Sequence, residues 1–173
     1  MFAEPTDHQY RTKWGIPVRF ISKHRARFVE IDPFGHMNVN HYVAYYSENR
    51  FIGHRECLGL DVKAISRFPV APHIRSIKIE FLRPVFADVE FTVESFISEL
   101  MDSSCVVLAT MTGATGILHS TCKFQISCVE KKTLTQIPWP DDFISLFYMR
   151  DEATTETQPV TKSKEQQNGV RDC

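Results

Sequence analysis

The chain has 173 residues, of which 43% are hydrophobic and 24% are charged. This length and composition predict one globular domain of ordinary size with a substantial core. The formal net charge of −1 gives no basis for nucleic-acid binding or for attachment to a membrane surface. The apolar runs are too short to span a membrane, and the N-terminus lacks the basic and then apolar pattern of a secretory signal, so we expect neither a membrane span nor secretion.

The cysteines and histidines show no pattern of a disulfide framework or a metal site. The five cysteines are odd in number and include no C-x-x-C pair, so we expect reduced thiols and a cytoplasmic compartment. The seven histidines include no pair at ligand spacing that a cysteine cluster supports. No metal site is therefore expected.

The first part of the chain predicts an extension followed by strands. Residues 1–15 are polar without a sustained period, and residues 16–22 turn apolar, with Pro17 indicating an edge position or a strand start. Residues 25–32 alternate as a strand would, which places Asp32 at the end of the strand. One face of this strand would carry Val29 and Ile31, and the other Phe28, Glu30 and Asp32.

A long helix is predicted from about Asn40 to Leu58. Asn38 or Asn40 can serve as its N-cap, and Gly59 is a natural stop at its C-terminus. Its predominantly aromatic face, at three- and four-residue spacing, comprises Tyr42, Tyr45, Tyr46, Asn49, Ile52 and Gly53. A helix this apolar on one side needs a large surface against which to pack.

The remainder of the chain predicts that surface. Four segments have strand patterns and follow one another as hairpins: residues 76–81, 89–94, 104–112 and 118–128. A short helical piece follows at residues 141–149. Residues 151–173 are polar, with almost no large apolar side chain, and are predicted to form a disordered tail after a domain of residues 16–150.

The predicted elements combine into an α+β fold, in which a curved antiparallel sheet of about five strands wraps around one long central helix. The loop before the helix reads Asp32-Pro-Phe-Gly-His36-Met-Asn38-Val-Asn40-His-Tyr42, and Arg83-Pro84 and Ile137-Pro138 follow downstream. This pattern resembles the hotdog-fold acyl-CoA thioesterases related to 4-hydroxybenzoyl-CoA thioesterase, over roughly residues 17–147.

The resemblance implies roles for several residues. In this family an Asp that matches Asp32 attacks the thioester carbonyl or activates water, and other branches use a helical Glu that matches Glu48. Plant acyl-carrier-protein thioesterases are similar around His36 and Asn38, but they have Asn where this chain has Phe34. The resemblance also implies a thioester of coenzyme A or acyl-carrier protein as substrate, coenzyme A entering only as part of that substrate with no other cofactor, and a homodimer or homotetramer.

Elementary chemistry favours the same reaction. A thiol with a pKa of roughly 8.5 leaves readily as thiolate, so thioester hydrolysis needs no strong general acid. Backbone N–H groups around Asn38 to His41 could hold the oxyanion, since the first N–H groups of a helix lack intrahelical partners. Asp32 would be either the nucleophile, through a mixed anhydride, or the general base for a water molecule.

The candidate residues fall into a catalytic and a substrate-binding group, and each has a structural alternative. The catalytic candidates are Asp32, His36, Asn38 and Glu48, and the substrate-binding candidates are Phe34, Asn40, Tyr42, Tyr45 and Arg83. Asp32 could simply start a turn, His36 could bond to backbone, and the asparagines could be caps. Arg83 and Lys123 could contact the phosphates of coenzyme A, but these two residues and Glu48 could also simply be solvated, and the tyrosines could belong to the core.

Two other functions remain open on the same fold. A hydroxyacyl-thioester dehydratase would place Asp and His five residues apart, which the four-residue gap from Asp32 to His36 fits poorly. A non-catalytic protein that binds acyl thioesters would keep the fold without the reaction. In each case the acyl pocket is expected beneath the helix, lined by aromatic residues that include Phe28, Phe34, Tyr45, Phe81 and Phe91.

Overall fold

The structure is a computed structural model and describes residues 7–149. In chain order its elements are η1 (Asp7–Tyr10), β1 (Ile16–Pro17), β2 (Phe20–Arg25), η2 (Phe28–Glu30), α1 (Val39–Leu58), α2 (Val62–Ser66), β3 (Val70–Phe81), β4 (Glu90–Leu100), β5 (Ser104–Gly113), β6 (Leu118–Glu130), α3 (Asp141–Ile144), η3 (Ser145–Phe147) and β7 (Tyr148–Met149). The η elements are short 3-10 helices.

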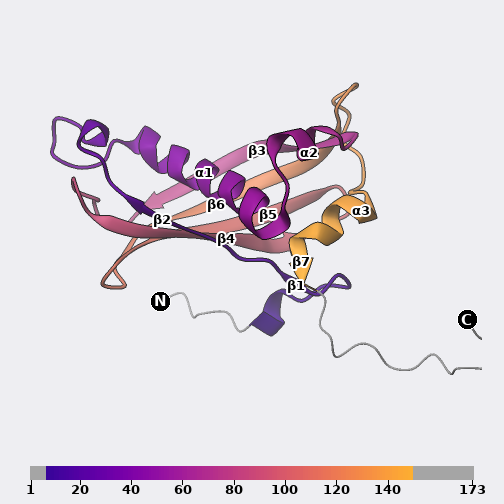
Figure 1. The fold of residues 1–173 in the computed structure, drawn as a ribbon, viewed down its shortest axis with the longest axis horizontal. Helices are drawn as coiled ribbons and strands as arrows, with labels where there is room; N and C mark the ends of the chain where they lie inside the picture. The colour runs from indigo at the N-terminus through magenta and orange to yellow at the C-terminus, as the bar shows by residue number, and fades with distance from the viewer. Residues whose placement is uncertain (1–6, 150–173) are drawn as a thin grey trace, which may run out of the picture.

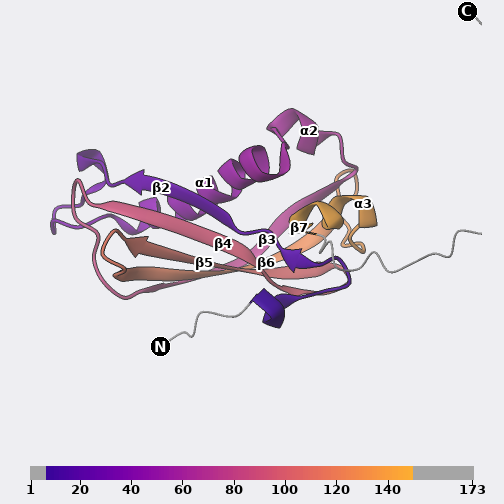
Figure 2. The same cartoon turned by 60° about the horizontal axis from the view of Figure 1, so that its bottom comes forward.

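A five-stranded antiparallel sheet forms the centre of the molecule, with the strand order β2-β4-β5-β6-β3. One long helix, α1, lies along one face of this sheet (Figures 1 and 2). A separate antiparallel pair joins β1 to β7. The predicted α+β arrangement of about five strands and one long helix is therefore confirmed.

The four strands predicted after the long helix are confirmed as β3 to β6, although β3 already begins at Val70. The strand predicted over residues 25–32 is wrong, because β2 ends at Arg25 and residues 28–30 form a 3-10 turn. Glu30 closes this turn by accepting hydrogen bonds from the Arg27 backbone N–H at 2.9 Å and from Arg27 Nε at 2.7 Å. Asp32 therefore lies in a loop and not at the end of a strand.

The described residues near both ends of the domain pack onto it. Tyr10 in η1 packs its ring 5.0 Å from the ring of Phe96 in β4, so the described part of the predicted N-terminal extension contacts the sheet. The predicted helical piece near the C-terminus is confirmed as α3 and η3, and β7 follows it. The predicted polar tail, residues 151–173, lies outside the described residues.

The predicted helix is confirmed, with Asn38 as its N-cap and Gly59 as its left-handed C-cap at φ 65°. The residues of α1 that are buried recur at helical spacing and face the sheet: Tyr42, Tyr46, Asn49 and Gly53. α1 packs mainly against β2 and β4. The approach is closest at Gly53, where an added Cβ would lie 2.0 Å from Cγ of Phe20.

Asn49 fixes the middle of α1 to the sheet through its buried side chain. Its Nδ2 donates to the backbone oxygens of Phe20 at 3.1 Å and Val93 at 3.0 Å, and lies 2.9 Å from Oγ of Ser22. Its Oδ1 accepts a hydrogen bond from the Ser95 hydroxyl at 2.5 Å. A buried amide with partners on both β2 and β4 holds the helix in one position along these strands.

Strand β3 is the long outer edge of the sheet. Its 12 residues pair with β6 only, so the backbone groups on its other side have no strand partner among the described residues. Several apolar side chains along and just beyond it are exposed, namely Ile74, Ile77, Phe81 and Leu82. Such an edge is a surface on which a further strand can add.

Candidate active site

The loop between η2 and α1 is a tight turn that contains the sequence motif. The Asp32 N–H donates to the backbone oxygen of His36 at 2.9 Å, and the Gly35 N–H donates to that of Asp32 at 3.0 Å. Gly35 has φ 87°, which favours glycine. The Phe34 N–H donates to Oδ1 of Asp32 at 2.9 Å, so one carboxylate oxygen does help to form the turn.

The other oxygen of Asp32 faces histidine. Its Oδ2 lies 3.4 Å from Nδ1 of His36, and the side chain of Asp32 is 15% exposed while that of His36 is 44% exposed. The turn is closed by the hydrogen bond from the Phe34 N–H to Oδ1, so the contact between Oδ2 and His36 is not needed to form the turn. The structure therefore brings two of the predicted catalytic residues together, with the carboxylate sheltered and the imidazole open to solvent.

The N-terminus of α1 begins directly after this loop. Oδ1 of Asn38 accepts from the Asn40 N–H at 3.0 Å, and the Asn38 backbone oxygen accepts from the His41 N–H at 3.0 Å. Asn38 is therefore the N-cap, and three of the N–H groups expected to hold an oxyanion are already bonded, since the Asn38 N–H itself donates to the Glu30 backbone oxygen at 2.9 Å. The N–H of Val39 has no partner within residues 7–149 and is the donor that remains.

The segment that follows β3, around Val85, is hydrogen-bonded to the loop and supports it. The Met37 N–H donates to the Val85 backbone oxygen at 2.8 Å, and the Val85 N–H donates to the Tyr42 hydroxyl at 3.3 Å. Tyr42 is buried, with its ring 5.0 Å from that of Phe81, and burial raises its pKa. Tyr42 is therefore a buried support of the loop, as its structural alternative predicts.

Arg83 lies two residues before Val85, in the same segment. It is exposed and lines a cavity of about 440 Å³ together with Phe86, Glu90 and His119. Lys123, the other basic residue considered for coenzyme A, has its Nζ 3.8 Å from Glu99 on the sheet. Of these two cations, Arg83 is the one that lies in the segment hydrogen-bonded to the Asp32 loop, through Val85 and Met37.

A buried carboxylate that the sequence did not reveal lies next to the motif. The Glu30 side chain is 1% exposed, and it accepts hydrogen bonds from Arg27 and, at 2.7 Å, from the Tyr45 hydroxyl. Burial acts to raise the pKa of Glu30, but the bonds from Tyr45 and Arg27 outweigh it and lower that pKa. Burial and the bond to Glu30 raise the pKa of Tyr45 to about 12, so its hydroxyl stays a donor.

His24 in β2 is a second polar residue near the motif that was not predicted from the sequence. Its ring stacks on Phe91 with 5.6 Å between centroids and meets Tyr45 edge-on at 4.9 Å, while Nε2 lies 2.7 Å from Oγ of Ser22. Burial lowers the pKa of His24, and the charges of Glu48 and Glu30 oppose this. Alternation along residues 20–25 places His24 on the inner face, which is the signal that could have identified it.

Glu48 does not meet Asp32 within one chain. Glu48 is exposed on α1, ten residues after Asn38, which corresponds to roughly 15 Å along a helix that rises 1.5 Å per residue. Its charge acts on His24. The two predicted catalytic carboxylates are therefore separated in the isolated chain.

The five aromatic residues expected to line an acyl pocket lie apart from the apolar cavity beneath α1, and their role in binding stays a prediction. Phe28 and Phe34 are 84% and 85% exposed and Phe81 is also exposed, whereas Tyr45 and Phe91 pack around His24. That cavity is lined by the C-terminal half of α1 and by α3, among other elements. Figure 1 shows α3 and the end of α1 at the opposite end of the molecule from the loop that precedes α1. None of the five predicted aromatic residues lines that cavity.

The antiparallel sheet wrapped around α1 defines a hotdog-fold protein. The chain belongs to the thioesterase-like superfamily, whose family model matches residues 26–147. No curated protein sequence matches the chain significantly.

Solved structures agree with this fold. DHNA-CoA thioesterase from Staphylococcus aureus is 15% identical, with a TM-score of 0.66 over 75% of this chain and 88% of that chain. The 1,4-dihydroxy-2-naphthoyl-CoA thioesterase from Synechocystis is 14% identical, with a TM-score of 0.67 over 75% and 96%. A further Staphylococcus aureus protein, whose structure was solved in complex with CoA, is 17% identical, with a TM-score of 0.68 over 84% and 98%.

Two negative findings concern the described part of the chain only. No helix within residues 7–149 is both long and apolar enough to cross a membrane. In the same range, no three or more His, Cys, Asp or Glu side chains are grouped so that they could hold a metal ion.

Proposed function

We propose that this protein is an acyl-CoA thioesterase in which Asp32 is the nucleophile or the general base. The observation that carries the proposal is the sheltered Asp32 carboxylate, which has Oδ1 fixed by the Phe34 N–H and Oδ2 3.4 Å from His36 Nδ1. This carboxylate precedes a helix whose Val39 N–H has no described partner. A fixed anion in the loop that leads to a helix with an unused donor suits an acyl transfer in which the negative charge moves to the carbonyl oxygen.

The steps balance with water as the only co-substrate. As nucleophile, Asp32 Oδ2 bonds to the thioester carbon, the C–S bond breaks, the thiolate leaves, and water then opens the anhydride. As general base, Asp32 takes a proton from a water molecule whose oxygen bonds to the same carbon; the C–S bond then breaks, the thiolate leaves, and Asp32 gives up the proton to the thiolate or to solvent. In both routes the Val39 N–H would hold the carbonyl oxygen while it is negatively charged, and His36 would position Oδ2 or the water.

Coenzyme A would bind as part of the substrate, with Arg83 as the cation for its phosphates. Arg83 lines a cavity beside the segment that supports the Asp32 loop, and an exposed guanidinium pairs well with phosphate oxygens. The structural similarity to a protein solved with CoA supports this class of substrate. Phe34 and Asn40, both exposed at the same end, would contact the pantetheine arm.

Two copies of the chain would form the complete enzyme by pairing their β3 edges. This edge is long, carries exposed Ile74 and Ile77, and has no strand partner on its outer side within the described chain. Pairing would bond its free backbone groups and cover its apolar side chains. Glu48 could then act on an Asp32 carboxylate only across the two copies, because roughly 15 Å of helix separates Glu48 from its own Asn38.

The test is thiol release from a panel of acyl-CoA esters by the native protein and by Asp32→Asn. The amide oxygen of Asn can still accept the Phe34 N–H, so the turn is kept while the negative charge is lost. We expect kcat/KM to fall by about 100-fold or more, the scale of a lost base or nucleophile. Asp61→Asn is the matched control, because Asp61 caps α2 by accepting the Ala64 N–H at 2.6 Å and lies outside the site.

Other outcomes contradict parts of the proposal. Full activity in Asp32→Asn would show that Asp32 is not a catalytic residue, and Glu48 would become the candidate for the catalytic carboxylate. Binding of acyl-CoA by the native protein without any thiol release would show a non-catalytic thioester-binding protein. A loss of the same size in Asp61→Asn would mean that the assay reports folding and not catalysis.

A further inference from the structure

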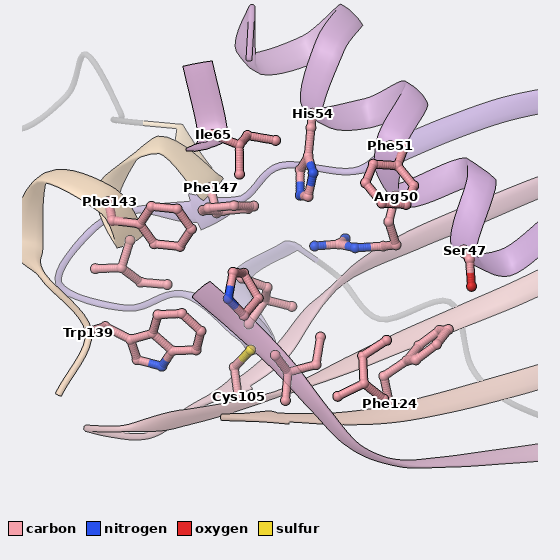
Figure 3. A pocket seen from close by; sticks show the side chains of 15 residues that line it. Ser47, Arg50, Phe51, His54, Ile65, Cys105, Phe124, Trp139, Phe143 and Phe147 are labelled. Carbon is pink, nitrogen blue, oxygen red and sulfur yellow. The ribbon is translucent and has the colours of Figure 1, made fainter. Parts of the chain in front are cut away.

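A cavity of about 340 Å³ lies beneath the C-terminal half of α1, within the range of about 300–1,000 Å³ typical of small-molecule sites. Its walls come from α1, α2, α3, η3 and four strands of the sheet. They are almost entirely apolar, and the large side chains include Phe51, Phe124, Trp139, Phe143 and Phe147. Two nitrogen-bearing side chains of α1, Arg50 and His54, point into this apolar space (Figure 3).

Arg50 brings a positive charge into the cavity without a counter-ion. Its Nη1 donates to the Ser95 hydroxyl oxygen at 3.3 Å, and its guanidinium lies 4.6 Å from the centroid of Phe20. No carboxylate within residues 7–149 forms an ion pair with it. Burial lowers the pKa of Arg50 to about 10, which still leaves it charged at neutral pH. A partly buried cation in apolar surroundings is costly unless an anion neutralises it.

His54 lies one helical turn after Arg50 and offers an unused polar atom. Its Nδ1 is buried and has no hydrogen-bond partner within residues 7–149, while its ring meets Phe20 and Phe147 edge-on at 5.6 and 5.5 Å. Burial, and then the charge of Arg50, lower the pKa of His54 to about 4. The imidazole is therefore neutral at pH 7, and in one tautomer Nδ1 carries a hydrogen that can be donated.

We propose that this cavity binds the carboxylate of a small apolar acid. The carboxylate would accept hydrogen bonds from the Arg50 guanidinium and from His54 Nδ1–H, and the apolar body would lie among the aromatic walls. One bound anion would thus supply both the missing charge for Arg50 and the missing partner for His54. The apolar walls would favour a hydrocarbon chain or ring over a polar anion such as phosphate.

This site is separate from the Asp32 loop of the same chain. Arg50 is twelve residues after Asn38, so roughly 18 Å of helix rise lies between them. None of Asp32, His36 and Asn38 lines the cavity. Binding of an acid here does not depend on the proposed hydrolysis, and the Asp32→Asn variant should bind it as the native protein does.

Calorimetric titration with octanoate tests the proposal, with 1-octanol and octylammonium as neutral and cationic probes of the same chain length. We expect octanoate to bind at one molecule per chain, and the other two probes to bind at least about tenfold more weakly, as the loss of a charge-assisted hydrogen bond implies. Equal binding of octanoate and octanol would overturn the proposal, because the cavity would then recognise only the hydrocarbon.

Variants of two arginines on the same helix, Arg50 and Arg55, make the test specific. Arg50→Met should weaken octanoate binding about tenfold or more, and Arg50→Lys should bind with intermediate affinity. Arg55→Met is the matched control, since Arg55 is exposed and pairs with Glu56. Equal octanoate affinity in Arg50→Met and Arg55→Met would rule out the guanidinium as the anion partner.

An NMR measurement on the native protein tests the binding pose without any substitution that could disturb folding. In the native protein, octanoate should shift the ¹⁵N resonance of His54 Nδ1, and octanol should leave it in place. Melting temperatures of all the variants show whether each is folded before its affinity is compared. A native protein in which octanoate binds but the His54 resonance does not move would contradict the assigned pose.

Discussion

The hydroxyl of Tyr45 donates a 2.7 Å hydrogen bond to the carboxylate of Glu30, which is fully buried. This bond joins the first half of α1 to the 3-10 turn that comes just before the Asp32 loop. The Glu30 backbone oxygen also accepts the Asn38 N–H at 2.9 Å. Glu30 therefore holds both the start of the loop and the cap of the helix, and it fixes the position of Asp32 without being part of the proposed chemistry.

Tyr45→Phe should lower the free energy of unfolding by about 1.5–3 kcal/mol at pH 7, because it removes a hydrogen bond to a buried charged group. The Glu30 pKa is lowered in the folded protein, so the ionised carboxylate contributes stability above the ordinary pKa of 4.5, and this stability is lost as the pH falls through the native pKa. Urea unfolding between pH 7 and pH 3 measures both effects.

The same titration gives the control for this prediction. Glu30→Gln should remove the part of the acid sensitivity that Glu30 causes, so its unfolding free energy should fall less steeply below pH 4.5 than that of the native protein. A Tyr45→Phe deficit that is as large at pH 3 as at pH 7 would contradict the prediction, because the loss of stability would then not depend on the charge of the Glu30 carboxylate.

Gly53→Ala should destabilise the fold by about 1–3 kcal/mol, the usual cost of overpacking, because the new Cβ would lie 2.0 Å from the Phe20 ring. Thermal and urea unfolding measure the loss. Phe20→Leu in the same chain should recover part of it, since a smaller side chain leaves room for the methyl group. If the changes in unfolding free energy of the two single substitutions simply added up in the double variant, the predicted contact between residues 20 and 53 would be contradicted.

Arg83→Gln should raise KM for acyl-CoA roughly tenfold or more while kcat changes little, because it removes a charged partner for phosphate and leaves the Asp32 loop intact. Steady-state thiol release provides the measurement. The same acyl group on N-acetylcysteamine, which has no phosphates, should show no such effect. Lys123→Gln is the matched variant and should behave like the native protein with both substrates.

Ile77→Lys should weaken the proposed dimer, because it places a charge in the exposed apolar row of β3. Light scattering at micromolar concentration should show two chains for the native protein and one for the variant. Ile21→Lys, on the opposite edge strand and also exposed, is the matched control and should remain a dimer. A native protein that is already monomeric would refute pairing through β3.

Much of the architecture can be predicted because its signals are local. The helical spacing of Tyr42, Tyr46 and Asn49, and the caps at Asn38 and Gly59, identify α1 from adjacent residues. Alternation identifies β3, β4 and β6, and a segment that is apolar on both faces identifies β5. Asp32, His36 and Asn38 can be grouped from sequence because they share one short loop. Their contacts depend on the turn itself, which Pro33 and Gly35 make recognisable.

The features that the sequence does not reveal depend on partners far along the chain. Glu30 reads as one residue of an alternating strand, but its burial requires Tyr45, fifteen residues later. The apolar cavity takes its walls from segments as distant as residues 47 and 147. Arg50 and His54 show only a four-residue spacing in the sequence, and nothing nearby indicates that the space in front of them is empty.

The unequal edges of the sheet determine how far an assembly of this chain can grow. At one side β2 is only six residues long, and its last residue, Arg25, is held by ion pairs to Asp88 and Glu90. The other side is the long apolar β3. Pairing of β3 with a second β3 uses up both long edges and leaves only short, charged ones. Such an assembly is closed, and it offers no end to which further chains could add to form a fibril.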